Sequence, residues 1–272
     1  MSEIEVTILG CGSSGGVPRI GGPNGAGDWG DCDPANPKNW RRRCSILVRQ
    51  KTDAGETAVV IDTAPEFREQ MVMAKCAALD AVLITHNHAD QTHGLDDIRA
   101  VAYGMRKRID LYTDRRSLDG LHDRFDYIFE TPKGSSYPPI AVPHEITVLE
   151  PFEVHGAGGA LPVLPFWQEH GNFGALGFRM GPVAYSSDVN ALPEESFAAL
   201  EGVELWILDA LRYTPHPTHA HVDLALEWIR RVKPKHAVLT NLHIDLDYET
   251  LKRELPAGVE PAYDGMVLTV RA

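Results

Sequence analysis

The sequence predicts an α/β fold in which two β-sheets pack against each other and helices cover the outside. Short apolar runs rich in Val, Ile and Leu, bounded by Gly, Pro, Asp or Asn, are typical of strands. Several such runs follow one another before helical stretches intervene, whereas strands and helices alternate in the later half. The 272 residues are 43% hydrophobic and 24% charged, which is ordinary for a globular protein with a sizeable core. No fixed-period repeat or linker is evident, so we predict a single domain over residues 1–272.

The apolar runs and their boundaries predict the individual elements. The predicted strands are Ile4–Leu9, Ser45–Arg49, Ala58–Ile61, Ala81–Thr85, Ile109–Thr113, Ile146–Leu149, Val183–Ser186, Leu205–Leu208, Ala237–Thr240 and Met266–Val270. The predicted helices are Pro65–Lys75, Asp96–Tyr103, Arg115–Glu130, Glu194–Leu200, Val222–Val232 and Tyr248–Glu254. Pro65 suits a first helical turn, and Asp223 and Glu249 lie early in their helices, where the helix dipole favours acids. Gly21–Gly30 and Gly156–Pro165 are predicted loops.

The formal net charge of −12 argues against extended nucleic-acid binding, because an acidic surface repels a phosphate backbone. A small anionic substrate is not excluded, since a metal ion and local arginines can override the overall field. Met1 to Glu5 carries two acids and does not resemble a secretory signal, and no stretch approaches a membrane span of about 18 apolar residues. The four cysteines are too few for a disulfide scaffold. We therefore expect a cytoplasmic location and no membrane association.

Two local patterns invite a phosphate-binding interpretation. Gly10–Gly15 matches G-x-G-x-x-G after a strand, but a dinucleotide fold needs a helix there, and the following Gly16–Pro23 cannot propagate one. The alternative is a tight glycine turn whose backbone N–H groups could cradle a phosphate. The second pattern is Arg41–Arg43, which is usually a solvated face, although three arginines could also contact a phosphate.

The segment Leu83–Gly94 carries the strongest chemical signal. A buried-type strand ends at Thr85, and the sequence His-Asn-His-Ala-Asp-Gln-Thr-His follows directly. Residues two apart in extended backbone point to the same side, so His86 and His88 can present two imidazoles to one cation, and Asp90 adds a carboxylate. Imidazole together with carboxylate suits Zn, Mn or Fe. Three histidines and one aspartate within eight residues favour a metal site over a histidine-rich polar loop.

A metal site needs further ligands, and candidates occur where other strands or loops end. His170 follows an apolar run, and Asp188 ends a predicted strand, where its carboxylate could bridge two cations. His219 and His221 precede a predicted helix, and His243 follows a strand. Each alone is better explained as a surface or capping residue. Their recurrence at strand ends makes them a set.

The sequence resembles the metallo-β-lactamase superfamily, whose common motif is H-x-H-x-D-H. It is most similar to the branch of phosphoribosyl 1,2-cyclic phosphate phosphodiesterases, with ribonuclease Z enzymes as more distant relatives. Besides the motif at His86, the matching segments are Gly10–Arg19, Trp29–Pro34, Arg43–Ser45, Ile61–Thr63, Gly94–Arg99, Tyr185–Asp188, Leu208–Arg212, His216–His219 and Pro261–Gly265. Each segment alone is weak evidence for this resemblance. The order that they share along nearly the whole chain is specific to the family.

The resemblance implies a four-layer αββα sandwich with metal ions at one edge of the two sheets. It implies a first metal ion held by His86, His88 and His170, and Asp188 as a bridge to a second. Asp90 would serve the second metal ion. His219 matches the histidine that lies beside the metals and assists the leaving group in the phosphodiesterases.

Two departures from the superfamily pattern affect the same site. The final histidine of the motif is Gln91 here, and a later Leu-Thr-His is replaced by a sequence ending in Asn241. In relatives both histidines serve the second metal, and an amide oxygen is a weaker ligand than imidazole for Zn. We therefore expect a divalent cofactor, Zn or Mn, with one or two ions, and His93 and His243 are the candidates for compensation. A structural zinc on cysteines is disfavoured, because Cys11, Cys32, Cys44 and Cys76 include no C-x-C or C-x-x-C spacing.

These observations lead to three functional hypotheses. The first is a metal-dependent hydrolase of a small, cyclic phosphodiester, in which Asp90 orients or deprotonates water and His219 protonates the leaving oxygen. The second is ribonuclease Z-like tRNA processing, which the acidic charge and the lack of a long basic insertion oppose. The third is a ligand-binding or regulatory protein with a degenerate site, which Gln91 and Asn241 support. Leu224, Trp228 and Ile229 share a predicted helix and either join the core or form a homodimer interface, and the pattern favours the core.

Overall fold

The computed structural model describes residues 3–271 and consists of two seven-stranded sheets flanked by helices. The first sheet has the order β14 (Val267–Arg271), β1 (Glu3–Gly10), β2 (Ser45–Thr52), β3 (Gly55–Ile61), β4 (Ala81–Leu83), β5 (Ile109–Thr113) and β6 (Ala141–Glu145). The second has the order β13 (Val259–Pro261), β12 (His236–Thr240), β11 (Leu205–Asp209), β10 (Val183–Ser186), β9 (Ala175–Met180), β8 (Gly159–Gln168) and β7 (Phe152–Gly156).

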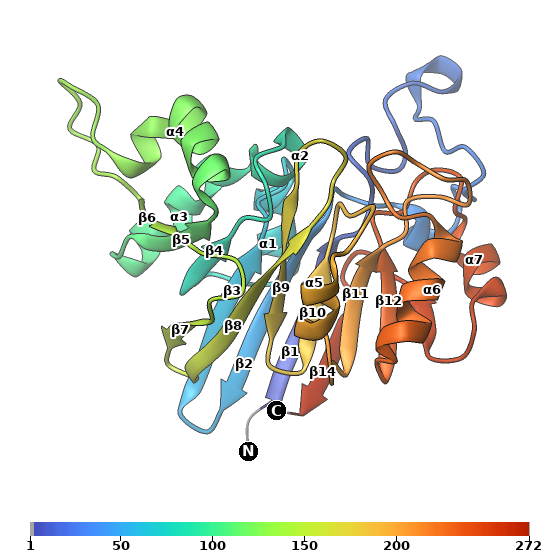
Figure 1. Cartoon of the computed structure of the whole chain (residues 1–272). Helices are drawn as coiled ribbons and strands as arrows, with labels where there is room; N and C mark the ends of the chain where they lie inside the picture. The colour runs from blue at the N-terminus through green and yellow to red at the C-terminus, as the bar shows by residue number, and fades with distance from the viewer. Residues whose placement is uncertain (1–2, 272) are drawn as a thin grey trace.

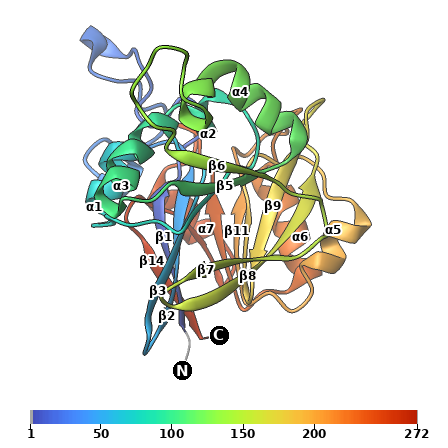
Figure 2. The same cartoon turned by 90° about the vertical axis from the view of Figure 1, so that its left-hand side faces the viewer.

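The helices form the two outer layers (Figure 1; Figure 2). Those on the first sheet are α1 (Phe67–Met73), α3 (Ile98–Met105) and α4 (Arg115–Phe129), whereas the single turn α2 (Ala89–Thr92) lies at the top edge of the sandwich in Figure 1. Those on the second sheet are α5 (Glu194–Ala199), α6 (Val222–Val232) and α7 (Tyr248–Glu254). Short 3-10 turns occur at Pro23–Gly25, Pro37–Asn39 and Leu95–Asp97. The predicted αββα sandwich is therefore confirmed.

Three separate hydrophobic cores hold these four layers together. One lies between the sheets, and the other two lie between each sheet and its helices. The strand β2 shows how the sequence achieves this, because Ile46 and Val48 belong to the core between the sheets whereas Leu47 packs under the helices. A strand buried on both faces therefore reads as a continuous apolar run. Trp228 of α6 is buried against the second sheet, as the helix pattern predicts.

The direction of the strands positions the candidate site. Neighbouring strands β3 and β4 are parallel, and so are β10, β11 and β12. Their carboxyl ends meet at one edge of the sandwich, at the top of Figure 1 near α2. In open α/β sheets this edge is where ligands bind. The polar segments predicted as metal-binding begin at this edge.

Most predicted elements are confirmed, and α6 and α7 have the predicted bounds. Two predictions are wrong. Ile146–Leu149 contains no strand; β6 comes just before it. Gly156–Pro165 is not a loop but the hairpin of β7 and β8. Glycines there form the turn, and Pro165 is tolerated because β7 pairs only as far as Val163, leaving Pro165 beside no strand on that side.

The described residues also bear on the expectations about membrane spans, disulfides and dinucleotide binding. Within residues 3–271, no helix is long and apolar enough to cross a membrane. The four cysteines, all within that range, are free thiols. No helix follows the glycine turn at Gly10–Gly15 over the next seven described residues. The dinucleotide-binding interpretation is thereby excluded.

Candidate metal centre

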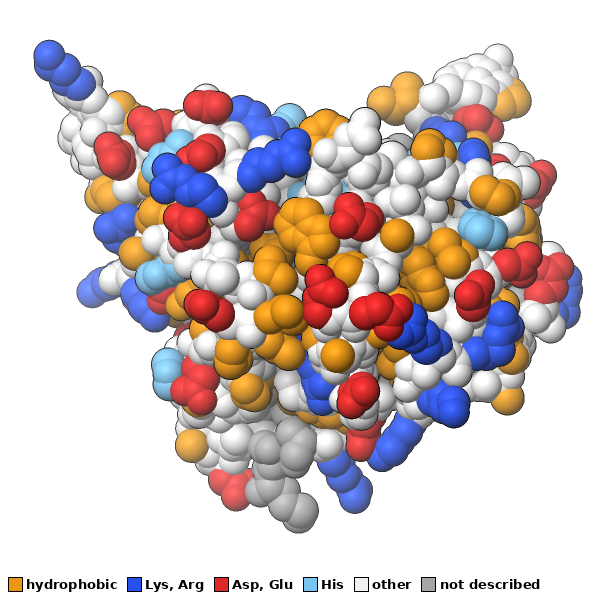
Figure 3. Space-filling model, viewed as in Figure 1, with side chains coloured by type: hydrophobic (Ala, Val, Ile, Leu, Met, Phe, Trp, Pro, Cys, Tyr) orange, Lys and Arg blue, Asp and Glu red, His pale blue; other side chains and the backbone are white. Residues whose placement is uncertain are grey.

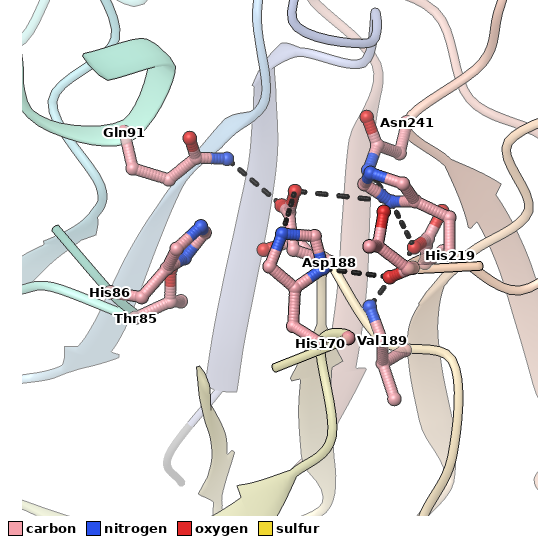
Figure 4. Close-up of polar contacts among 12 residues, drawn as sticks. Thr85, His86, Gln91, His170, Asp188, Val189, His219 and Asn241 are labelled. Atoms are coloured by element: carbon pink, nitrogen blue, oxygen red, sulfur yellow. Dashed lines mark hydrogen bonds and ion pairs between the residues drawn. The ribbon is translucent and has the colours of Figure 1, made fainter. Parts of the chain in front are cut away.

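Three imidazole rings converge at the edge of the sandwich, and Figure 4 shows two of them, those of His86 and His170. His86 and His88 follow β4, and His170 follows β8 of the other sheet. Their ring centroids lie 4.4 Å (His86–His88), 5.1 Å (His86–His170) and 5.2 Å (His88–His170) apart. One ligand atom from each lies within 4.8 Å of the others, which is compatible with one cation between them. The site therefore joins the two sheets.

The Thr85 hydroxyl and the Asp62 carboxylate orient the ring of His86. The hydroxyl lies 2.9 Å and 3.0 Å from the two oxygens of Asp62 and 3.0 Å from Nδ1 of His86. Burial raises the pKa of Asp62, whereas the Thr85 backbone N–H, which donates to it at 2.8 Å, favours the ionised form, as does a cation among the three imidazoles. With an ionised Asp62, the hydroxyl donates to the carboxylate and accepts from Nδ1–H of His86.

The opposite nitrogen of His86 is then free to bind a metal ion. Within residues 3–271, His86 Nε2 is a buried atom without a hydrogen-bond partner. Burial lowers the pKa of His86 to about 3, so the ring is neutral, as a metal ligand must be. A buried, neutral imidazole nitrogen with nothing to bind is unfavourable unless a cation satisfies it. This atom is the observation that best fits a metal ion here.

His170 is oriented in the same way. Its Nδ1 lies 2.7 Å from the backbone carbonyl oxygen of Thr218, which can only accept a hydrogen bond. Nδ1 therefore carries the proton, and Nε2 presents its lone pair. Nε2 lies 4.0 Å from Oδ1 of Asp188. Such outer contacts fix the tautomer of a metal ligand and hold its ring.

Asp188 lies at the centre of the site and contacts residues from several elements. It is 3% exposed and follows β10 with a φ of 55°, a left-handed conformation that Asp and Asn adopt more readily than most residues. A second possible ligand group consists of His170, Asp188 and His219. Burial raises the pKa of Asp188, but His86, His219 and His170 outweigh it and lower the pKa below its usual value.

His219 is held between two carboxylates. Its Nδ1 donates to Oδ2 of Asp209 at 2.8 Å and lies 3.9 Å from Oδ1 of Asp188. The same Asp209 oxygen accepts the backbone N–H of Val189 at 3.0 Å. Burial lowers the pKa of His219, but the charge of Asp209 and the hydrogen bond with it raise the pKa to about 9. His219 therefore keeps a proton at neutral pH in this arrangement.

The two residues that depart from the superfamily pattern both point into the site (Figure 4). Gln91 Nε2 donates to Oδ2 of Asp188 at 2.9 Å. Asn241 Nδ2 lies 3.1 Å from Nδ1 of His219. Both side chains are buried, with 1% and 2% exposure. They are therefore part of the site and not surface substitutions.

Asp90 lies on α2 and belongs to neither possible ligand group found among residues 3–271. Burial and repulsion by the Asp188 carboxylate raise its pKa to about 7. A carboxyl group with this pKa can accept or release a proton near neutral pH. Its position beside Asp188 fits a role in proton transfer better than a role as a ligand of the three-histidine group.

The other predicted histidines lie in different surroundings. His93 packs against Phe125 at a centroid distance of 5.9 Å. His221 is the residue before α6, and His243 forms an ion pair of 2.9 Å with Asp245. Within residues 3–271, none of these three histidines belongs to either possible ligand group. The structure therefore does not bring them to the imidazole cluster.

The glycine turn and the arginines do not form a phosphate cradle. Cys11 N donates to Asp264, and Gly12 and Ser13 donate to backbone carbonyls. Arg41 is only 1% exposed and donates to the carbonyl oxygens of His243 and Leu246. Its neighbours Arg42 and Arg43 form ion pairs with Glu69, Asp264 and Glu66. The solvated-face interpretation is therefore wrong for Arg41, and the phosphate interpretation finds no support.

Comparison with known proteins agrees with this geometry. Residues 57–244 match the model of the β-lactamase superfamily domain, which is more than half of the chain. The chain belongs to the metallo-β-lactamase superfamily. The match begins in β3 and includes all five residues of the two possible ligand groups.

Solved structures of superfamily members are similar over almost the whole chain. A diphosphatase of the PhnP family has 33% sequence identity and a TM-score of 0.85, and covers 99% of this chain and 98% of its own. Zinc-bound PqqB from Methylobacterium extorquens has 18% identity, a TM-score of 0.71 and coverage of 97% and 99%. The short form of human tRNase Z has 17% identity, a TM-score of 0.61 and coverage of 97% and 98%. The last two show a shared fold alone.

One curated relative has a different kind of name. An octanoyltransferase of Porphyromonas gingivalis (strain ATCC BAA-308 / W83) is 32% identical over 264 residues, which is 95% of this chain. The chain spans about half the length of that relative. The name therefore does not identify the activity of the shared half.

Sequence reasoning missed the residues that support the histidines. Thr85, Asp209 and the carbonyl oxygen of Thr218 are hydrogen-bond partners of His86, His219 and His170, and Asp62 is the partner of Thr85. A signal was present, because Asp62 and Asp209 both stand at the end of an apolar strand. The sequence gives no way to assign these partners, since all of them except Thr85, which precedes His86, lie 10 to 48 residues away from the side chain that they contact.

Proposed function

We propose that this protein is a metal-dependent hydrolase that cleaves a small phosphodiester or diphosphate substrate. The observation that carries the proposal is the convergence of His86, His88 and His170, together with the buried Nε2 of His86, which has no hydrogen-bond partner among residues 3–271. Three imidazoles with a nearby carboxylate form a donor set that suits Zn or Mn. A metal ion held there would supply Lewis-acid activation of water and of a phosphoryl oxygen.

Two side chains are suited to move protons in this reaction. Asp90, with its pKa near 7, accepts a proton from the attacking water. His219 holds one proton on Nδ1 against Asp209 and carries a second on Nε2, which it donates to the leaving oxygen. Asp209 keeps the imidazole in this orientation. The division of tasks resembles other acid–base pairs whose surroundings move their pKa values apart.

The dimensions of the neighbouring surface favour a small substrate. A cleft of about 210 Å³ adjoins His86 and is lined by Arg116, Trp167 and Phe173. The Arg116 guanidinium lies 4.8 Å above the ring of Phe173, and that ring is 5.1 Å from His88. A cation beside the imidazole cluster favours an anionic substrate. Acidic and basic side chains are interspersed on the face seen in Figure 3, which does not favour an extended nucleic acid.

The PhnP-family diphosphatase supports the phosphorus chemistry, since it is 33% identical over nearly the full length of both chains. Phosphodiester and diphosphate bonds are hydrolysed by the same type of reaction, in which water attacks phosphorus and an anionic oxygen leaves. The octanoyltransferase relative supports a carboxylic ester or thioester as the second class to test, with the limit that only half of that protein is shared.

The experiment is an activity measurement on metal-free protein reloaded with Zn²⁺ or Mn²⁺. The probes are bis(p-nitrophenyl) phosphate, a cyclic phosphodiester, a nucleoside diphosphate and p-nitrophenyl octanoate. We expect turnover of a phosphorus ester that disappears with a chelator and returns with metal. His86→Ala lowers it at least about 100-fold. His155→Ala is the matched control, because His155 is exposed on β7 and leaves the rate unchanged.

Other outcomes would contradict the proposal. Turnover of phosphorus esters by metal-free protein would refute the metal dependence. Hydrolysis of octanoate alone would refute the substrate class while retaining the hydrolase. A protein that binds metal but cleaves none of the probes would favour the degenerate-site hypothesis that Gln91 and Asn241 raise.

A further inference from the structure

We infer that this centre binds a single metal ion tightly, and that the amide side chains of Gln91 and Asn241 fill the position where a second ion would lie. The ion is held by His86, His88, His170 and one oxygen of Asp188. The inference rests on the metal centre of the proposed function. It concerns the number of ions, which neither the superfamily match nor the neighbouring structures decide.

The first argument is a count of free ligand atoms. His86 Nδ1 is bonded to Thr85 and His170 Nδ1 to the Thr218 carbonyl, so each offers only Nε2. His219 Nδ1, its atom closest to Asp188, donates to Asp209. Asp188 Oδ2 accepts from Gln91, so Oδ1 is its free oxygen.

The two possible ligand groups therefore compete for the same atoms. The second group needs His170 Nε2, Asp188 Oδ1 and His219 Nδ1. The His86 group uses His170 as well, Asp188 Oδ1 lies 4.0 Å from His170 Nε2, and His219 Nδ1 already carries a proton directed at Asp209. The free atoms therefore form one set, made of the three imidazole nitrogens and the Asp188 oxygen beside His170.

The second argument comes from the orientation of Gln91. Its NH₂ group faces Asp188 Oδ2, and an NH₂ group has no lone pair to give to a metal ion. Turning the amide over would place Oε1 against a carboxylate oxygen, which repels it unless a cation lies between them. Gln91 thus puts a hydrogen-bond donor, with its partial positive charge, beside Asp188.

Asn241 closes the other side of the same position. It follows β12 with a φ of 63°, and its amide faces Nδ1 of His219 at 3.1 Å. Because that nitrogen already donates to Asp209, the amide contacts a group that is engaged elsewhere and not a free ligand. Gln91 therefore holds Asp188 by a hydrogen bond, and the Asn241 NH₂ group, which has no lone pair for a metal ion, occupies the space beside His219.

One consequence concerns Asp188, which the superfamily resemblance implies is a bridge between two ions. With Oδ2 bound to Gln91, Asp188 has one oxygen left and acts as a ligand of one ion. Gln91 then acts as a positioning residue, because it fixes which oxygen of Asp188 faces the His86 group.

The experiment is a metal titration without substrate. Full-length protein is stripped with a chelator and titrated with Zn²⁺ and, separately, Mn²⁺, against a coloured competing chelator. Elemental analysis after gel filtration gives ions per chain. We expect one tightly bound ion, with any second ion bound about 100-fold more weakly. The double variant Gln91→His/Asn241→His is expected to bind two ions tightly.

A Gln91→Leu variant shows whether Gln91 binds a metal ion or only fills space. Gln91→Leu keeps the bulk of the side chain and removes its polar atoms, and it leaves one tight ion per chain. Two tight ions in the unchanged protein would overturn the inference and leave the proposed function intact. No tight ion would overturn both. One tight ion in a folded double-histidine variant would overturn the role assigned to the two amides, and circular dichroism establishes that the variant is folded.

Discussion

Replacing Thr85 with valine tests how the structure prepares His86 for a metal ion. The change keeps the shape of the side chain and removes the hydroxyl that contacts both Asp62 and His86 Nδ1. Without it, nothing in this contact fixes the ring or its tautomer. The loss of such an outer contact typically lowers metal affinity 10–100-fold, which corresponds to about 1.4–2.8 kcal/mol. The lost hydrogen bond to the Asp62 carboxylate destabilises the fold by about 1.5–3 kcal/mol.

Thr113 provides the matched control for this experiment. Its hydroxyl is equally buried on the neighbouring strand and donates to the Ile84 carbonyl at 3.0 Å, without touching His86. Thr113→Val should lower the free energy of unfolding by about 1 kcal/mol and leave metal affinity unchanged. Thr85→Ser retains the hydroxyl and should retain the affinity.

Two assays separate these effects. Zinc affinity is measured by competition with a coloured chelator, and stability by denaturant unfolding of the metal-free protein. We expect only Thr85→Val to lose zinc affinity, while both valine variants lose stability. If neither valine variant loses zinc affinity, the Thr85 hydroxyl does not prepare His86 for the metal ion. If both variants lose affinity to a similar degree, the affinity merely follows the stability of the fold.

Three further predictions concern groups outside the imidazole cluster. Burial raises the pKa of Asp264 to about 6, so its ionisation destabilises the fold as pH rises from about 4 to 6. Urea unfolding at pH 4.5 and at pH 7.5 gives the unfolding free energies of the wild type and of Asp264→Asn. Between these two pH values the wild type should lose about 2 kcal/mol of stability relative to Asp264→Asn. Asp247 caps α7 by accepting from Thr250 N at 3.0 Å, and Asp247→Ala should cost about 1–2 kcal/mol. Burial raises the pKa of Asp247, but hydrogen bonds outweigh it and lower the pKa to about 2. The stability lost in Asp247→Ala is therefore fully present above the unfolded pKa of about 4, and it should be equal at pH 5 and pH 8. Phe178 is fully buried between the sheets, and Phe178→Ala should lower the unfolding free energy by about 3–5 kcal/mol in the same assay.

The sequence predicts those parts of the fold whose signals are local. The helix α6 is one example, because its apolar face and its early acid Asp223 define both ends. The strands β7 to β9 are another kind of case. Gly156 and Gly159 suggest a loop, yet they form the turn of a hairpin that is stabilised by pairing with distant segments. Pairing of this kind has no counterpart in the local pattern.

The site shows the same division. The spacing of His86, His88 and Asp90 predicts chemistry at one strand end. The sequence cannot reveal that Asp90 stands apart from the three-histidine group, because that depends on the short helix α2 beginning at Ala89. Extended backbone would place all three side chains on one face, whereas the helix rotates Asp90 away from that alternation.

The backbone at the strand ends explains why Asn241 can depart from the superfamily pattern without disturbing the fold. Asp62, Asp188 and Asn241 follow β3, β10 and β12 and share left-handed φ values of 64°, 55° and 63°. Asn, Asp and His are the non-glycine residues that adopt this conformation most readily. Position 241 can therefore exchange histidine for asparagine, a ligand for a hydrogen-bonding amide, while the chain still turns toward the site. The Asn241→His change in the metal titration is consequently a test of chemistry at a backbone position that accepts both side chains.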